Sequence, residues 1–416
     1  MGQNFTIFDV EYECRNKSTP LNCNLTWENA GDVLNLTKLG ATKYGEFEAD
    51  GDLAGDALLA SFVVPTAVSL SICVSLVLSL WMYRFDSPKI KRYTPSPGGA
   101  KRRRQRQEAR IGAATPPDAQ PKNELSYDIL ETILVAMADY QIIFGAALCV
   151  YFNVIGKCGV SMYHFNMGLN LLIVICGNTL LTLVIMRSFW AAPVSSLARL
   201  VAIGLLLFYQ GKILWIQHAR NQSFGMAEAL PTTERNSSLI LLQAACFLDP
   251  RALGNLTSQL YDDDATIKTA RINVVGDLNH DGKKSVELYI WFFLVFCFAA
   301  VVVYQLAALL KACCRRKLKS GEYAPVTKKH RGCLHTSRLF LCTLTLLLSS
   351  VVCIWRIMYL YSLKGWVSES GWMKEDAYLG NEESGISSFG QAAALCTAIG
   401  FVFVAAERIE WKRARS

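Results

Sequence analysis

Long runs of apolar residues alternate with polar segments along the whole chain. Seven of these runs are long enough to cross a hydrocarbon core of about 30 Å as α-helices, which takes roughly 20 residues. They cover residues 58–83, 129–155, 163–186, 197–217, 287–311, 337–361 and 387–406. The pattern therefore predicts an all-α membrane protein, built as a bundle of seven transmembrane helices.

The distribution of Lys and Arg predicts how this bundle is oriented, because cytoplasmic loops retain positive charge. These residues concentrate in the segments 84–128, 312–336 and 407–416, while the tail 1–57 and the loop 218–286 carry fewer for their length. We therefore expect the N-terminus outside and the C-terminus inside, with an extracellular loop of about 70 residues between the fourth and fifth helices. The tail lacks the short apolar core of a cleaved signal peptide, so we expect the first span to direct insertion.

Composition agrees with this topology. The chain is 52% hydrophobic and 18% charged, whereas charged residues make up about a quarter of ordinary soluble proteins. Its net charge of +8 includes the run Lys101 to Arg104 beside the first span. We interpret that run as a topology determinant that touches anionic lipid. The expected partners are the bilayer and a cytosolic signalling partner at the basic loops, and nucleic acid is not expected.

Glycosylation sequons give an independent indication of orientation. All of the Asn-x-Ser/Thr motifs fall on the predicted outer face, at Asn4, Asn16, Asn24, Asn35, Asn221, Asn236 and Asn255. N-linked glycans mark secreted surface segments. We therefore expect a glycoprotein of the plasma membrane or of another secretory-pathway membrane.

Cysteine placement predicts disulfide bonds on the same face. Of the 14 cysteines, those in predicted extracellular segments are Cys14, Cys23, Cys158 and Cys246. An even number of cysteines in an oxidising compartment favours pairing. We prefer the pairs Cys14 with Cys23 and Cys158 with Cys246, and the alternative is that some of these thiols stay free.

The loop before the fifth span contains a weak calcium motif. Asp277, Asn279 and Asp281 present oxygen atoms at alternate positions before Gly282, as a calcium loop requires. The acidic residue expected at the twelfth position is absent, because Glu287 comes one residue early. An ordinary turn is the alternative, and no other cofactor is expected.

Polar residues inside the apolar runs are the candidate functional residues, namely Asp139, Gln141, Asn170, Asn178, Lys212 and Arg356. A carboxylate in lipid costs roughly 2.5 to 3.5 kcal/mol on insertion scales, so we expect Asp139 to face the bundle interior. Its expected partner is Lys212, or else Arg356, or an amide against a protonated carboxyl. The alternative for both cations is snorkelling toward the outer interface. The amides are expected to tie helices together.

The hairpin of the second and third spans also carries a resemblance. It contains Asp139-x-Gln141, then Gly145, a Tyr163-His164 pair, and a Leu181-Thr182 exit followed by Arg187. In these motifs residues 125–190 resemble a group of uncharacterised multi-pass membrane proteins of filamentous ascomycete fungi. The resemblance implies a fungal origin and a seven-span fold, and it implies no activity.

The topology is also similar to that of G-protein-coupled receptors, although their signature motifs are absent. Arg187 follows Met186 with no acidic residue before it, the sixth span has no proline near Trp355, and the seventh has no Asn-Pro pair. Similarity of topology alone is a weak warrant for function.

Three classes of function follow from these observations. The first is a receptor-like or sensory protein of the fungal cell surface, favoured by the outer glycosylation sites and basic inner loops. The second is a transporter or channel with Asp139, Lys212 and Arg356 in its pathway. The third is an intramembrane enzyme or a scaffold. For an enzyme we find no catalytic residues, because the chain's histidines are scattered and no paired carboxylates or Ser/His arrangement accompanies them.

Overall fold

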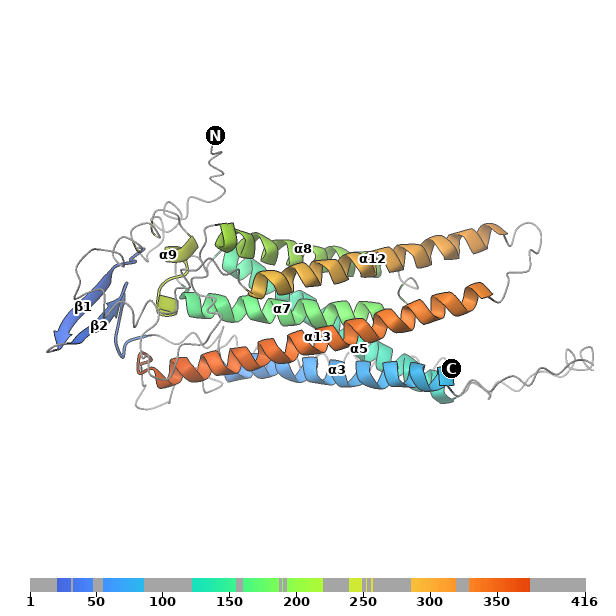
Figure 1. The fold of residues 1–416 in the computed structure, drawn as a ribbon, viewed down its shortest axis with the longest axis horizontal. Coiled ribbons are helices and arrows are strands. Elements are labelled where there is room, and N and C mark those ends of the chain that lie inside the picture. Colours follow the sequence, from blue (N-terminus) through green and yellow to red (C-terminus); the bar gives the residue numbers. More distant parts are fainter. Residues whose placement is uncertain are drawn as a thin grey trace, which may run out of the picture.

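The computed structural model describes residues 21–30, 33–47, 55–85, 122–154, 160–186, 189, 193–219, 239–248, 252, 256, 286–318 and 329–374. Long helices form one bundle with a small cap at one end (Figure 1). The helices are α3 (Asp56–Phe85), α5 (Lys122–Val154), α7 (Met162–Ile185), α8 (Pro193–Ala219), α12 (Val286–Leu318) and α13 (Lys329–Glu369).

Each of these six helices contains a stretch long and apolar enough to cross a membrane. The stretches are Leu58–Met82, Ile129–Phe152, Met162–Ile185, Val194–Trp215, Val286–Ala307 and Leu339–Glu369. The predicted multi-pass helical membrane protein is confirmed at this level. The seventh predicted stretch, 387–406, lies outside the described residues. The last helix continues past the predicted end at residue 361, because Leu363, Trp366 and Val367 are also buried.

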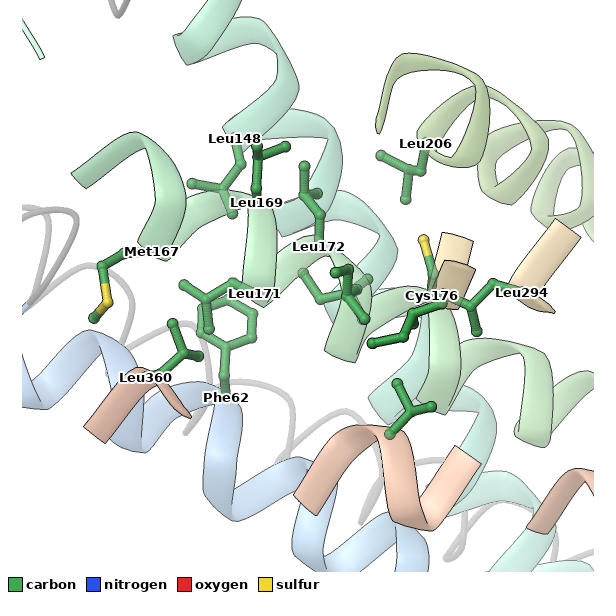
Figure 2. Packing of buried hydrophobic residues seen from close by; sticks show 14 of the residues in the cluster. Phe62, Leu148, Met167, Leu169, Leu171, Leu172, Cys176, Leu206, Leu294 and Leu360 are labelled. Carbon is green, nitrogen blue, oxygen red and sulfur yellow. The ribbon is translucent and has the colours of Figure 1, made fainter. Parts of the chain in front are cut away.

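Helix α7 is the centre of the bundle. All of its residues from Met162 to Ile185 are buried, and α13, α5, α3, α12 and α8 pack around it. Figure 2 shows Leu169, Leu171 and Leu172 of α7 among apolar side chains of the surrounding helices, labelled Phe62, Leu148, Leu206, Leu294 and Leu360. A helix that is apolar on every side is buried on every side. Polar side chains of α7 consequently need partners within the protein.

The surrounding helices expose large apolar side chains on their outer surfaces. Ile143 of α5, Phe208 of α8 and Phe296 of α12 are each at least 70% exposed. Many further large apolar side chains of these helices are also exposed, and large exposed apolar patches are rare on soluble monomers. In a bilayer it contacts lipid tails, so the packing supports the membrane assignment independently of helix length.

Glycines permit close contact between helices at defined points. A side chain at Gly168 of α7 would collide with the Phe152 ring of α5, and one at Gly211 of α8 would collide with the Trp291 ring of α12. The Trp291 indole N–H also donates to the carbonyl of Leu207, at 2.8 Å. These contacts set the spacing of α5 and α12 against their neighbours.

The cap, defined as residues 21–30, 33–47 and 239–248, covers one end of the bundle, which we name the cap end. Its strands β1 (Leu25–Ala30), β2 (Val33–Leu39) and β3 (Thr42–Lys43) form an antiparallel sheet in the order β1-β2-β3. The turn between β2 and β3 places Gly40 at a φ of 61°, in the left-handed region that favours glycine. The short helices η2 (Leu239–Leu241) and α9 (Ala245–Leu248) lie at the same end (Figure 1).

A disulfide bond joins the two parts of the cap. It links Cys23 to Cys246 across 223 residues of sequence. The expected pairs Cys14 with Cys23 and Cys158 with Cys246 are therefore wrong. The reason is that Gln243 accepts a hydrogen bond from the backbone of Asn22, which brings the loop alongside the tail. Cys14 and Cys158 lie outside the described residues.

Candidate functional site

The cap is attached to the bundle at the start of α7 and at the end of α13. Met162 N–H donates to the Leu242 carbonyl at 2.6 Å, and Ala244 N–H donates to the Val160 carbonyl at 2.9 Å. Phe47 forms a parallel bridge with Met373, just after α13. The cap therefore contacts the central helix α7 and the segment that follows α13, the helix packed most extensively against α7. We name this contact region the cap junction.

Aromatic side chains fill the cap junction. The Phe47 ring stacks on the His164 ring, with centroids 5.7 Å apart, and meets Tyr163 edge-on at 6.4 Å. Tyr44 meets Trp372 edge-on at 5.2 Å, and its hydroxyl donates to the Ser370 carbonyl. Edge-to-face and offset-stacked aromatic pairs stabilise a contact beyond the area they bury. The predicted Tyr163-His164 pair thus contacts the N-terminal segment.

Toward the middle of the bundle, α12 and α13 are joined by a buried ion pair. Glu287 stands in the first turn of α12, and its Oε1 lies 2.6 Å from Nη1 of Arg356 on α13. Both side chains are at most 3% exposed. Along α13, Arg356 lies about 12 Å farther from the cap end than Lys364, at 1.5 Å per residue. Lys364 itself pairs with Asp56 at the start of α3.

The ion pair is tied to the central helix by amides. Arg356 Nη1 also donates to Asn170 Oδ1 at 3.3 Å, and Asn170 Nδ2 donates to Asn166 Oδ1 at 2.7 Å. Asn166 Nδ2 in turn donates to the Tyr359 hydroxyl at 3.0 Å. We name these five residues, Asn166, Asn170, Glu287, Arg356 and Tyr359, the polar cluster. It connects α7, α12 and α13 in one hydrogen-bonded network.

The polar cluster is incompletely satisfied. Within the described part of the chain, Oε2 of Glu287 and Nε of Arg356 are buried and have no hydrogen-bond partner. The guanidinium carbon of Arg356 lies 4.4 Å from the Trp355 ring centroid, and this cation–π contact offsets part of the lost hydration. A buried polar atom without a partner costs roughly 1 to 3 kcal/mol. A rearrangement that paired these atoms without breaking the existing bonds would recover that cost.

A second set of amides lies deeper in the bundle. Gln141 of α5 donates to the Thr66 hydroxyl of α3 at 3.0 Å and accepts from Asn178 Nδ2 of α7 at 2.7 Å. Gln141 and Asn178 are fully buried. This arrangement joins three helices, which is the structural role that the sequence predicted for such amides.

Asp139 forms an ion pair with Arg199. Its two carboxylate oxygens accept from Nε and Nη2 of Arg199 at 2.5 and 2.7 Å, in a fork that joins α5 to α8. The side chains are 33% and 13% exposed, respectively. The expected pairing of Asp139 with Lys212 or Arg356 is therefore wrong, because Arg199 reaches the carboxylate from the start of α8.

The position of the Arg356 side chain also contradicts the alternative that it snorkels toward the outer interface. Its side chain points into the bundle and is only 2% exposed, because Glu287 and Asn170 supply the compensation that an interface would otherwise give. Of the expected intramembrane polar residues, the structure brings Asn170 and Arg356 together, places Gln141 with Asn178, and sets Asp139 apart from both groups.

Sequence reasoning misses both true ionic partners. Arg199 stands near the start of an apolar run, where it resembles an inner loop charge. Glu287 stands one residue before the last position of the calcium motif, where it resembles a misplaced ligand. The usable signal is that each charge lies within a turn or two of a helix end, where a long side chain still reaches a partner inside the bundle.

Two of the predicted glycosylation sites lie in the described part of the cap. Asn24 is exposed in the cap and Asn35 lies on β2, opposite Glu28 of β1. The remaining sequons and the calcium candidates Asp277, Asn279 and Asp281 fall outside the described residues. Among the residues that are described, no group of three or more His, Cys, Asp or Glu side chains is arranged to hold a metal ion.

No protein-family model, curated protein or solved structure matches the chain. The resemblance of residues 125–190 to fungal membrane proteins therefore stays an expectation from sequence.

Proposed function

We propose that the protein is a receptor-like or sensory protein of the cell surface, with the cap on the extracellular side. Three features support this orientation. The cap contains a disulfide bond and the sequons Asn24 and Asn35, and the Lys/Arg-rich segments lie on the opposite side of the predicted spans. Disulfides and N-glycans both belong to the secretory and extracellular compartment.

The observation that carries the proposal is the continuity between the cap junction and the polar cluster. Both involve the same two helices, because Phe47 contacts His164 of α7 and pairs with Met373 after α13, while Asn170 of α7 holds Arg356 of α13. A change at the cap is thus transmitted to the ion pair with α12 through packed, continuous helices. Coupling of this kind requires an element with two arrangements that both sites bias.

The polar cluster supplies such an element. Its unsatisfied atoms on Glu287 and Arg356 leave alternative hydrogen-bonding arrangements within reach. Shifting the pair changes the separation of α12 and α13, whose far ends flank the Lys/Arg-rich segment 312–336. We propose that this segment recruits the cytosolic partner.

The transporter alternative receives less support from the same geometry. Its predicted pathway joined Asp139, Lys212 and Arg356. Asp139 instead accepts two hydrogen bonds from Arg199, between α5 and α8. Arg356 pairs with Glu287, between α12 and α13. These two charge pairs do not form one continuous polar route among the described residues.

The proposal is tested with a deletion strain complemented by wild type, Tyr359→Phe, or the lipid-facing control Phe340→Leu, at matched surface abundance. Tyr359→Phe removes the hydroxyl that accepts from Asn166, while Phe340 is 67% exposed. We expect deletion and Tyr359→Phe to alter the transcriptional response to a change of medium, with uptake of radiolabelled amino acids, glucose and phosphate unchanged. Defective uptake with an intact transcriptional response would contradict the proposal.

A further inference from the structure

Residues 44–47 lie against the bundle in the way that a bound peptide lies on its receptor. Phe47 N–H donates to the Trp372 carbonyl at 2.8 Å, and Lys374 N–H donates to the Phe47 carbonyl at 3.1 Å. Phe47 and Tyr44 supply two aromatic anchors, on His164 and Trp372 respectively. Backbone pairing for affinity with side-chain anchors for specificity is the mode of strand addition.

The surface that receives this segment is built from the bundle itself. Ser161 Oγ lies 2.8 Å from Nδ1 of His164, at the start of α7. After α13, Trp372 N–H donates to Ser370 Oγ, and Ser370 N–H donates to the Trp366 carbonyl. These bonds do not involve residues 44–47. His164 and Ser370 are therefore positioned in part by bonds within the bundle itself.

The segment is anchored independently on both sides of this contact. The Cys23–Cys246 bond anchors the chain before it, and α3 begins after it at Asp56. Within the segment Gly45 has a φ of 78°, and no atom lies within 4 Å of the position that a Cβ would take there. Phe47 is the one buried residue of the four, at 4% exposure, while Tyr44 and Glu46 are exposed. A segment held by a single buried side chain opens locally without unfolding the domain. Residues 44–47 are therefore able to leave while the bundle stays folded.

The present occupant also leaves one anchor unsatisfied. Trp372 is fully buried, and its indole N–H has no acceptor among the described residues. A buried donor without an acceptor disfavours the arrangement that leaves it so. An occupant that supplies one carbonyl or carboxylate oxygen to this N–H would bind better than residues 44–47 do.

We propose that the junction of α7 with residues 370–374 is a binding site for an extracellular peptide, and that residues 44–47 are its tethered, displaceable occupant. The ligand class is a short peptide of the pattern aromatic-Gly-x-aromatic that turns at its glycine, because the positive φ of Gly45 turns the chain so that Tyr44 and Phe47 both reach the surface. The inference deepens the proposed receptor function and rests on it for its physiological meaning. The binding itself is measurable separately.

The test uses the purified full-length chain in lipid nanodiscs and a fluorescein-labelled synthetic peptide of residues 42–48, TKYGEFE. Phe47→Ala weakens the tether, and a site freed from its competitor shows a higher apparent affinity. We expect the peptide to bind Phe47→Ala at least about tenfold more tightly than wild type or the control Phe340→Leu. The peptide TKYGEAE, which lacks the second anchor, should not bind. Equal binding of both peptides, or no binding to Phe47→Ala, would overturn the proposal.

Hydrogen exchange on the wild-type chain keeps the test decisive if Phe47→Ala fails to fold. Excess unlabelled TKYGEFE should speed exchange of the Phe47 amide, because that amide leaves Trp372, while the Lys374 amide stays protected by the incoming peptide. Unchanged exchange at Phe47 under saturating peptide would exclude displacement. Peptide binding without any cellular response would instead refute the receptor function and leave the site standing.

Discussion

At the scale of single residues, Glu287 and Arg356 are the most constrained charges that the structure describes. Each is at most 3% exposed, so neither recovers hydration if its partner is removed. Asp139 and Arg199 have better hydrogen-bond geometry but are 33% and 13% exposed. Burial therefore ranks the two pairs in the opposite order from geometry, and their responses to substitution should differ accordingly.

Removing one member of the buried pair should be strongly destabilising. We expect Glu287→Leu or Arg356→Met alone to lower the free energy of unfolding by about 3 to 5 kcal/mol, because an unpaired buried charge remains or the network is broken. The double variant should recover most of this loss. Reversible unfolding in mixed micelles measures all three proteins. A double variant no more stable than the worse single variant would contradict this assignment.

Substitution at Asp139 should have a smaller effect. Asp139→Asn keeps the side-chain shape and one acceptor for Arg199, and partly exposed pairs contribute about 1 kcal/mol or less. We expect normal surface abundance and a normal transcriptional response in this variant. Loss of the response at normal abundance would show that the charge itself is required.

At the scale of elements, close helix contacts depend on glycine as much as on apolar surface. Gly168 lets the Phe152 ring lie against the backbone of α7, whereas Gly365 of α13 has no atom within 4 Å of the position that a Cβ would take. A change to alanine at these two positions should consequently have different effects on the free energy of unfolding.

Gly168→Ala should destabilise the bundle by about 1 to 3 kcal/mol through overpacking. Phe152→Leu in the same chain should relieve part of that loss. Gly365→Ala is the matched control, and it should be neutral or stabilising by up to about 1 kcal/mol, because alanine favours the helix. The same unfolding assay checks the set, and equal destabilisation at both glycines would show that the Phe152 contact is not responsible.

The apolar runs are sufficient to predict the six described spans. The thickness of the hydrocarbon core requires an uninterrupted apolar helix of about 20 residues, and such runs are rare in soluble proteins. The partners of the charges were not predictable in the same way. Lys212 was the expected partner of Asp139, but the sequence does not specify which faces of two helices meet, and α8 presents Arg199 to α5. The sheet of the cap was not predicted, because its strands are short and a disulfide between distant positions joins the tail to the loop.

At the scale of the whole molecule, the Cys23–Cys246 bond joins the tail to the loop after α8. Mass-spectrometric mapping without reduction should recover the linked peptides containing these two cysteines. A peptide linking Cys158 to Cys246 would exclude the cap arrangement described above.

The orientation of the cap is the premise of the proposed function, and a single measurement on intact cells tests it most directly. The chain carries a C-terminal tag, and cells are treated with external protease, followed by glycosidase treatment of the recovered protein. We predict that the tag is protected and that the glycosidase lowers the apparent mass. In Asn24→Gln this decrease in mass should be smaller by one glycan. A tag cleaved from outside intact cells, on a chain without glycans, would contradict an extracellular cap and the receptor function built on it.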